Sequence, residues 1–178
     1  MTAPRQLADL NALVPADFVA ALAPVWENAP WVTEAVALGR PFPSAGDLHA
    51  AMLAQVTALP PEELRAFLNR HPDLGGADLR AGRVTADSQA EQQAIRLHSL
   101  DATEAAEWDE LNAAYKARFG FPFILCVRRH DRASTLAALR ARLERSTPAE
   151  LAAAIEEIAW ITRYRLAARI ADHGLTGL

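Results

Sequence analysis

The chain has 178 residues, of which 51% are apolar, so it can bury one sizeable hydrophobic core. Its net charge of −4 disfavours nucleic-acid binding, because proteins that bind nucleic acid present a basic face. No apolar run approaches the roughly 20 residues that span a bilayer, and the N-terminus lacks the pattern of a secretory signal. We therefore expect a cytoplasmic protein with a single domain over residues 1–178 and with no membrane or nucleic-acid partner.

Helix signals follow one another through the first part of the chain. A helix is predicted after Pro15, with apolar residues spaced by four: Phe18, Leu22 and Trp26. A short helix within residues 27–44 is closed by Gly39 and two prolines, and residues 46–58 predict a third helix. Pro61 opens a fourth, which should end near Arg70 because a residue that precedes proline disfavours the α conformation. His71, which precedes Pro72, should therefore lie at a helix end or in a loop.

The second part of the chain predicts further helices and one exception. Thr85 is the expected N-cap of a helix to about Leu100. Another helix should run from about Asp101 to Phe119, with Gly120 ending it. Two more helices are expected to follow, over residues 133–145 and from Pro148 towards Asp172. Between the helix that ends at Phe119 and the one that begins near residue 133, FPFILCV (121–127) favours an extended conformation, but no other predicted strand could pair with it. The prediction is all-α: one compact domain of about eight helices with this extended connector.

Cys126 is the only cysteine, which excludes an intramolecular disulfide and a cysteine-based metal site. Because it lies in an apolar run, a buried inert thiol is favoured over a nucleophile. The sequence has no HExxH motif, no histidine pair spaced by four, no GxGxxG motif and no P-loop. We therefore expect neither a metal site nor a cradle for a nucleotide cofactor.

Two predicted helices place polar residues on apolar faces. Ser88, Glu91 and Gln92 share one helical face with Ile95, so they should point inward unless that face is in fact solvated. An inward carboxylate requires a partner. In the last helix the apolar stripe leads to Arg165, whereas Arg163 points elsewhere. An inward arginine suits a carboxylate substrate, and it suits a structural ion pair equally well.

His71 stands in a turn-rich loop, where side chains are often placed for function, although most such histidines are not catalytic. The residues alone therefore indicate a helical protein with a pocket of His, Glu, Arg, Ser and Gln side chains, without naming a reaction.

The chain as a whole resembles the 2-oxo-4-hydroxy-4-carboxy-5-ureidoimidazoline (OHCU) decarboxylase family. The resemblance rests on seven segments in order: LNALVPADF (10–18), ENAPWV (27–32), GRPF (39–42), HPDLGG (71–76), SQAEQ (88–92), LNAAYKARFGFPFILCV (111–127) and RYRL (163–166). HPDLGG, SxxEQ and FGFPFI at these spacings are its most specific part. It implies a helical fold and decarboxylation of OHCU to (S)-allantoin in urate degradation.

The resemblance also implies residue roles. His71 would be the catalytic acid and Glu91 its catalytic partner, whose charge would raise the pKa of the imidazole. The implied substrate-binding residues are Pro72, Ser88, Gln89, Ala90, Gln92, Arg165 and, through main-chain groups, Phe123, Ile124, Leu125, Cys126 and Val127. Fixed donors would stabilise the charge that develops when CO₂ leaves, with the substrate's own carbonyl as electron sink. The implied partner is OHCU, no cofactor is implied, and the family is compatible with a homodimer.

Two other functions stay open at this point. One is a lyase or hydrolase that uses the same pocket on a related ureido or imidazoline acid. The other is a helical binding module without enzymatic activity, in which the inward polar residues are structural.

Overall fold

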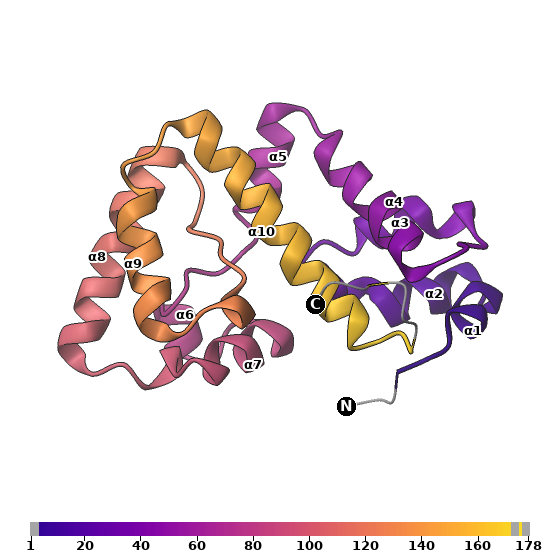
Figure 1. Cartoon of the computed structure of the whole chain (residues 1–178), viewed down its shortest axis with the longest axis horizontal. Coiled ribbons are helices and arrows are strands. Elements are labelled where there is room, and N and C mark those ends of the chain that lie inside the picture. The colour runs from indigo at the N-terminus through magenta and orange to yellow at the C-terminus, as the bar shows by residue number, and fades with distance from the viewer. Residues whose placement is uncertain (1–3, 172–174, 176–178) are drawn as a thin grey trace. The chain divides into compact units, whose positions relative to one another are not determined.

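The structure is a computed structural model that describes residues 4–171 and residue 175. The described residues form ten α-helices, labelled in Figure 1, and four short 3-10 helices. They contain no β-strand, only one isolated bridge between Arg5 and Ile170. The all-α prediction is confirmed, and the excess over about eight helices comes from pieces of four to six residues. No helix in the described part is long and apolar enough to cross a membrane.

The chain divides into two compact units. The first comprises Met1–Leu64 and Ala159–Leu178, and the second comprises Arg65–Ile158. Two helices contain the boundaries: α5 (Pro61–Leu68) and α10 (Thr147–Ala167). That residues 1–178 act as a single domain stays a prediction.

The first unit packs short helices around aromatic and aliphatic side chains. Its helices are α1 (Leu7–Ala12), α2 (Pro15–Leu22), η1 (Ala23–Val25), α3 (Trp31–Val36), η2 (Ala37–Gly39) and α4 (Ala45–Thr57). Its core includes Phe18, Leu22, Trp26, Val32, Leu48 and Met52, all at most 2% exposed. The Trp26 indole Nε1 donates to Met52 Sδ at 3.2 Å, which gives the buried N–H a partner.

Two predictions in the first unit need correction. The helix after Pro15 ends at Leu22, and Trp26 follows a separate 3-10 turn. Pro24 explains the break, because proline inside a helix removes a hydrogen bond and clashes with the preceding turn. Helix α1 was not predicted; it has no side-chain N-cap and buries only Leu7 and Leu10.

The second unit contains the connector. Its helices are the end of α5, α6 (Ala77–Arg80), α7 (Ala86–Ala94), η3 (Leu97–Ser99), α8 (Ala102–Phe119), η4 (Val127–Arg129), α9 (Arg132–Arg142) and the start of α10. Helices α8 and α9 lie side by side, and the non-helical connector leads from the end of α8 towards α9 (Figure 1). The buried core includes Leu68, Leu97, Trp108, Tyr115, Phe121, Phe123 and Leu139.

Capping residues set several boundaries in the second unit as predicted. Thr85 Oγ1 accepts from the Ser88 amide at the start of α7. Asp101 and Glu104 form a reciprocal capping box at the start of α8. Gly120 ends α8 with φ of 79°, a left-handed conformation that favours glycine. These local signals place the helix ends to within one residue.

Other boundaries in the second unit differ from the prediction. Helix α7 ends at Ala94, six residues before Leu100, and Arg96 takes the left-handed conformation with φ of 61°. No glycine marks this stop, so the sequence had no local signal for it. Helix α6 lies in the segment predicted to be rich in turns, and its four residues are too few for a periodic pattern.

Helix α10 ends at Ala167 rather than near Asp172, which lies outside the described residues. Beyond the helix the backbone pairs with Arg5: the Arg5 amide donates to the Arg169 carbonyl at 2.9 Å, and the Ala171 amide donates to the Arg5 carbonyl at 2.8 Å. This pairing supplies the partners that a further helical turn would have supplied.

The burial of His49 in the first unit predicts a pH-dependent stability. Desolvation, reinforced by the positive charge of Arg163, lowers the pKa of His49 from 6.5 to about 4, and its Nε2 lies 2.9 Å from Thr162 Oγ1. Between pH 4 and pH 6.5 the unfolded chain therefore binds more protons than the folded chain. The free energy of unfolding should be highest above pH 6.5 and fall by on the order of 3 kcal/mol towards pH 4.

Denaturant unfolding from pH 4 to pH 8 measures this dependence. His49→Gln should flatten the part of the curve below pH 6.5, whereas His98→Gln, at an exposed histidine, should leave it unchanged. An identical slope in wild type and His49→Gln would contradict the assignment to His49.

Candidate functional site

His71 lies three residues after the end of α5, in a bend, as predicted for a residue that precedes proline. Its amide donates to the Leu68 carbonyl at 3.1 Å, and its ring packs edge-on against Phe67, with ring centroids 5.5 Å apart. The ring atom Nδ1 lies 3.3 Å from the same carbonyl. A carbonyl can only accept, so Nδ1 bears the proton in this contact.

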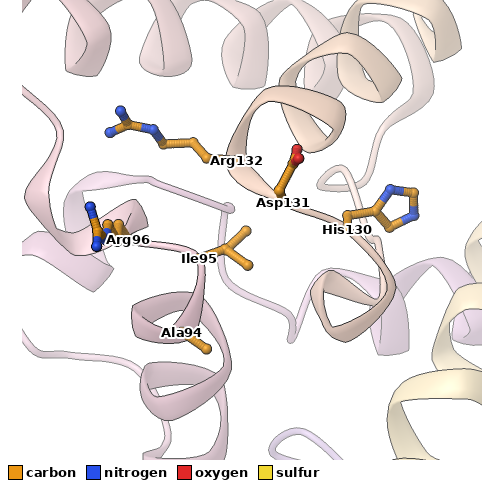
Figure 2. A pocket seen from close by; sticks show the side chains of 6 residues that line it. All are labelled: Ala94, Ile95, Arg96, His130, Asp131 and Arg132. Atoms are coloured by element: carbon orange, nitrogen blue, oxygen red, sulfur yellow. The ribbon is translucent and has the colours of Figure 1, made fainter.

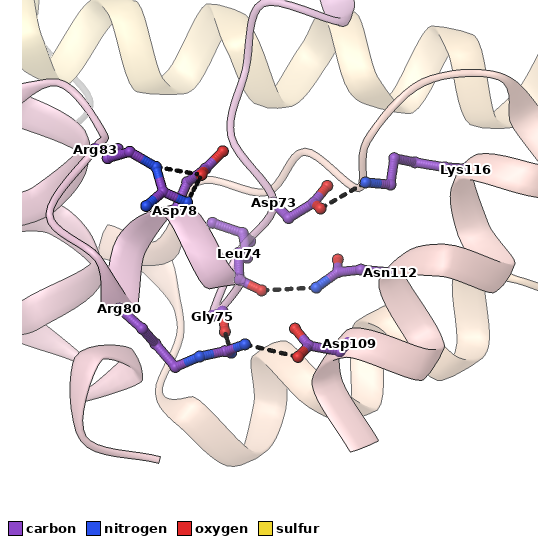
Figure 3. Close-up of polar contacts among 9 residues, drawn as sticks. All are labelled: Asp73, Leu74, Gly75, Asp78, Arg80, Arg83, Asp109, Asn112 and Lys116. Atoms are coloured by element: carbon purple, nitrogen blue, oxygen red, sulfur yellow. Dashed lines mark hydrogen bonds and ion pairs between the residues drawn. The ribbon is translucent and has the colours of Figure 1, made fainter. Parts of the chain in front are cut away.

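The loop after His71 is held from α7 and α8 through both main-chain and side-chain contacts. Asn112 Nδ2 donates to the Leu74 carbonyl at 2.9 Å, and Lys116 Nζ pairs with Asp73 at 2.6 Å (Figure 3). The Gly75 amide donates to Gln92 Oε1 at 3.0 Å, which joins the HPDLGG loop directly to the SxxEQ helix. The position of His71 therefore depends on side chains from two other helices.

Gly75 is required at the centre of this loop. Its φ of 64° is left-handed, and a Cβ there would lie 3.2 Å from both Trp108 and Leu100. Its carbonyl accepts from Arg80 Nη1, and Arg80 also pairs with Asp109 on α8 (Figure 3). The first glycine of HPDLGG therefore has a steric role that composition alone does not reveal.

The inward face predicted for α7 is confirmed. Ser88, Glu91 and Gln92 are 5%, 8% and 2% exposed, so the solvated-face alternative is wrong. Of the other residues predicted on this helix, Gln89 and Ile95 are half-buried and Ala90 is exposed. Since Gln92 uses its oxygen on Gly75, its amide N–H₂ group is the part suited to a substrate.

Glu91 faces Arg128, a cation outside the motifs that predicted the site. Its Oε1 lies 3.6 Å from Nε of Arg128, whose side chain is 44% exposed. Arg128 directly follows the FPFILCV run, and a cation beside a predicted main-chain binding segment is the signal that could have drawn attention to it. The buried carboxylate thus has a charged neighbour on the side of the connector.

The connector is fully buried from Phe121 to Val127, and α9 and α10 each contact its main chain. Arg142 Nη1 donates to the Ile124 carbonyl at 2.9 Å, and Glu157 Oε2 accepts from the Cys126 amide at 2.8 Å. The main-chain N–H and C=O of Leu125 have no hydrogen-bond partner among the described residues. Buried main-chain groups of this kind are suited to binding a polar ligand.

The thiol of Cys126 agrees with the inert interpretation. Burial, together with the negative charges of Glu157 and Glu91, raises its pKa to about 11. The thiol therefore stays protonated near neutral pH and is a poor nucleophile. The electrostatic influence of both carboxylates also shows that Glu91 and Glu157 both lie near Cys126.

A buried charged group supports the connector from behind. Arg142 pairs with Glu150, which also accepts from the Tyr115 hydroxyl; Arg142 and Glu150 are 4% and 0% exposed. Tyr115 in turn packs edge-on against Phe123, with ring centroids 5.4 Å apart. Burial and the hydrogen bond to Glu150 raise the pKa of Tyr115, so its hydroxyl remains a donor.

Arg165 belongs to the first unit, whereas the other predicted site residues belong to the second. It is 3% exposed, so the predicted inward orientation is confirmed. Its Nη1 pairs with Glu27 at 2.8 Å, which is the structural alternative considered above. Binding of substrate by Arg165 stays a prediction.

A separate open cavity of about 500 Å³ lies between the end of α7 and the start of α9 (Figure 2). Its lining residues are Ala94, Ile95, Arg96, His130, Asp131 and Arg132. The Ser134 amide and hydroxyl hold the pKa of Asp131 below its usual value, which is the ordinary effect of helix capping. None of the predicted site residues lines this cavity. Among the described residues, no group of three or more His, Cys, Asp and Glu side chains could hold a metal ion.

The hydrogen bond from Asn112 to the His71 loop predicts a measurable loss of stability. Asn112→Ala leaves the buried Leu74 carbonyl without its donor, which should reduce the free energy of unfolding by about 1–3 kcal/mol. Lys116→Ala, one turn along the same helix, removes a partly exposed ion pair to the same loop and should cost less than about 1 kcal/mol. Denaturant unfolding compares the two variants, and equal losses would contradict the assigned importance of the Asn112 contact.

The comparisons with known proteins agree with the arrangement of these motifs. The OHCU decarboxylase family model matches residues 11–167. A 2-oxo-4-hydroxy-4-carboxy-5-ureidoimidazoline decarboxylase from Amia calva is 40% identical over 88% of this chain and 90% of that protein. The enzyme of the same name from Haloferax volcanii is 34% identical over 93% and 96%. The uric acid degradation bifunctional protein PucL of Bacillus subtilis is 37% identical over a region that makes up 94% of this chain and 33% of that protein.

Solved structures show the same fold. The crystal structure of an (S)-allantoin synthase matches with a TM-score of 0.73 and 28% identity, over 93% of this chain and 54% of that one. The crystal structure of an OHCU decarboxylase in the presence of (S)-allantoin matches with a TM-score of 0.61 and 22% identity, over 79% and 90%. Given the match of the family model to most of its length, the chain belongs to the OHCU decarboxylase family.

Proposed function

We propose that the chain converts OHCU to (S)-allantoin with His71 as the general acid and Glu91 as its catalytic partner. The carboxy-lyase activity on OHCU, a step of urate degradation, follows from family membership. One structural observation carries the residue assignment: the hydrogen bond between the Gly75 amide and Gln92 Oε1 at 3.0 Å. It ties the loop that bears His71 to the helix that bears Ser88 and Glu91.

The reaction breaks one C–C bond and forms one C–H bond. When CO₂ leaves, the electron pair remains on a ring carbon next to nitrogen and a carbonyl, and the negative charge spreads onto oxygen. Fixed hydrogen-bond donors in a buried site stabilise such charge without having to reorganise. The ring carbon then takes a proton on one face, which sets the (S) configuration, and the imidazole regains its proton from water.

His71 suits the proton transfer because its ring is already oriented. The Leu68 carbonyl beside Nδ1 and the ring of Phe67 hold the imidazole, so that Nε2 is the atom that delivers the proton. General acids of this kind contribute about 100- to 10,000-fold to the rate.

Glu91 favours the protonated imidazole through its negative charge. A buried carboxylate alone would repel an anionic substrate, and Arg128, with Nε 3.6 Å away, offsets that charge. In this proposal Arg128 lets one site hold both a carboxylate that supports His71 and a substrate that has a carboxylate of its own.

The remaining proposed contacts are with the body of the substrate. Ser88, Gln92 and the main chain of residues 123–127 are buried and donate or accept hydrogen bonds, which suits a ureido-imidazoline with many polar atoms. Pro72, Gln89 and Ala90 complete the set on the loop and on α7, and Arg165 is proposed as a further binding residue for the substrate's carboxylate. A homodimer and a cytoplasmic location are also proposed.

Replacement of His71 tests the central assignment. His71→Asn should lower the catalysed rate by at least about 100-fold, because an amide cannot deliver the proton. Circular dichroism should follow the reaction on OHCU generated in situ by urate oxidation and hydrolysis, where enzymatic turnover gives optically active (S)-allantoin and spontaneous decay gives a racemate. His98→Asn, at an exposed histidine, is the matched control and should retain wild-type activity. Wild-type turnover in His71→Asn would remove His71 from the mechanism.

Neutralising Glu91 tests its coupling to His71. Glu91→Gln keeps the size and an acceptor oxygen but removes the charge, so kcat should fall by roughly tenfold or more. The limb of the pH–rate profile on which the general acid loses its proton should move to lower pH. A rate profile that keeps its position on the pH axis would contradict electrostatic coupling of the two residues.

A further inference from the structure

No strand in the described part of the chain lies beside the buried connector, so some of its main-chain groups depend on side chains for hydrogen bonds. The run from Phe121 to Val127 is buried throughout, and it lies outside any helix until η4 begins at Val127. Two of its polar main-chain groups are satisfied by charged side chains. Arg142 on α9 donates to the Ile124 carbonyl at 2.9 Å, and Glu157 on α10 accepts from the Cys126 amide at 2.8 Å.

These two contacts lie on the same edge of the connector. In an extended backbone the N–H and C=O of one residue point to one side, and those of the next residue point to the other. Ile124 and Cys126 are two residues apart and therefore share an edge. Leu125, between them, presents its N–H and C=O to the opposite edge, where no described residue bonds to either.

We infer that Glu157 is a positioning residue for the decarboxylation, which acts through the Cys126 amide to hold the main chain of Leu125 in place for the substrate. The inference rests on the proposed function, in which main-chain groups of residues 123–127 bind the substrate and stabilise the developing negative charge. Glu157 does not touch the substrate in this account. It fixes the main chain on the edge of the connector that faces α10. Because successive peptide groups are planar and directly linked, this also fixes the N–H and C=O of Leu125 on the opposite edge.

Arg142 and Glu157, the two side chains that bond to the connector, differ in burial and in their other partners. This difference makes Glu157 the better residue to test. Arg142 is 4% exposed and is tied to the buried carboxylate of Glu150, so its removal would leave an uncompensated buried charge and endanger the fold. Glu157 is only half-buried, and among the described residues its one hydrogen bond is to the connector. Its replacement should therefore act on the connector with little effect on the core.

The position of Glu157 relative to the thiol supports the same geometry. Its negative charge and that of Glu91 both act on the Cys126 thiol, so the carboxylate proposed for catalysis and the carboxylate proposed for positioning both lie near this residue of the connector. The Cys126 amide is occupied by Glu157, which leaves the main chain of Leu125 as the better donor and acceptor for the substrate.

A pair of substitutions separates the hydrogen bond from the charge. Glu157→Gln retains an oxygen that can accept from the Cys126 amide and should keep kcat within about threefold of wild type. Glu157→Met has nearly the same length but no acceptor, and its kcat should fall roughly 10- to 100-fold, because a displaced donor stabilises the transition state poorly. KM should change less than kcat in the Met variant, since the lost contact matters most when charge develops. Glu156→Met, at the neighbouring exposed residue of the same helix, is the control and should keep wild-type kcat and KM.

Each outcome has one meaning. Loss of kcat in Glu157→Met with recovery in Glu157→Gln, at wild-type far-UV circular dichroism and Tm, supports the inference. Wild-type kcat in Glu157→Met overturns it, and so does an equal loss in both variants, because the charge rather than the hydrogen bond would then be responsible. If Glu157→Met does not fold, Glu157→Asp replaces it: the shorter side chain withdraws the acceptor and should lower kcat in the same way, and wild-type kcat there overturns the inference. Absence of optically active product with the wild-type chain would instead refute the proposed function.

Discussion

Buried backbone that belongs to neither a helix nor a sheet must find hydrogen-bond partners elsewhere, and this requirement organises the second unit. The connector is such a segment. Its aromatic and aliphatic side chains are buried, and two of its main-chain groups bond to charged side chains. Arg142 donates to one carbonyl, and Glu157 accepts from one amide. Arg142 then needs Glu150, and Glu150 needs the hydroxyl of Tyr115, whose ring packs on the connector again. These contacts therefore begin and end at the connector, and the residues that satisfy its main chain also pack against it.

The loop that bears His71 follows the same logic with neutral groups. Its backbone turns through a left-handed glycine and is satisfied by amide side chains, Asn112 for a carbonyl and Gln92 for an amide. Amide groups can do this without the desolvation that a buried charge would require. The general acid proposed here is therefore placed by helices that are distant in sequence, and the short segment between α5 and α6 has little freedom to move it.

Among the described residues, the buried acidic side chains lie beside cations of opposite charge. Glu27 pairs with Arg165 and Glu150 with Arg142, while Glu91 has the half-exposed Arg128. The first two pairs are closed within the protein, whereas Arg128 retains access to solvent. A cation that is held loosely can share its charge between a protein carboxylate and a ligand, which a fully buried pair cannot do as readily. This contrast separates the arginines that support the fold from the one that we place beside the chemistry.

The sequence by itself determined the helical class, most helix starts and the inward face of α7. Those features depend on local physics: capping by Thr85 and Asp101, the left-handed stop at Gly120, and the period of apolar residues. Only the tertiary structure decided where α7 and α10 end and which residue pairs with which. The end of α10 is set by main-chain pairing with Arg5, and the charge of Arg165 is compensated by Glu27, 138 residues away. The contacts of Glu157, Asn112 and Arg128 likewise join distant parts of the chain, and no spacing along one helix encodes such a contact. Local signals can place a side chain on a face, whereas the partner on the other side of that face exists only once the chain has folded.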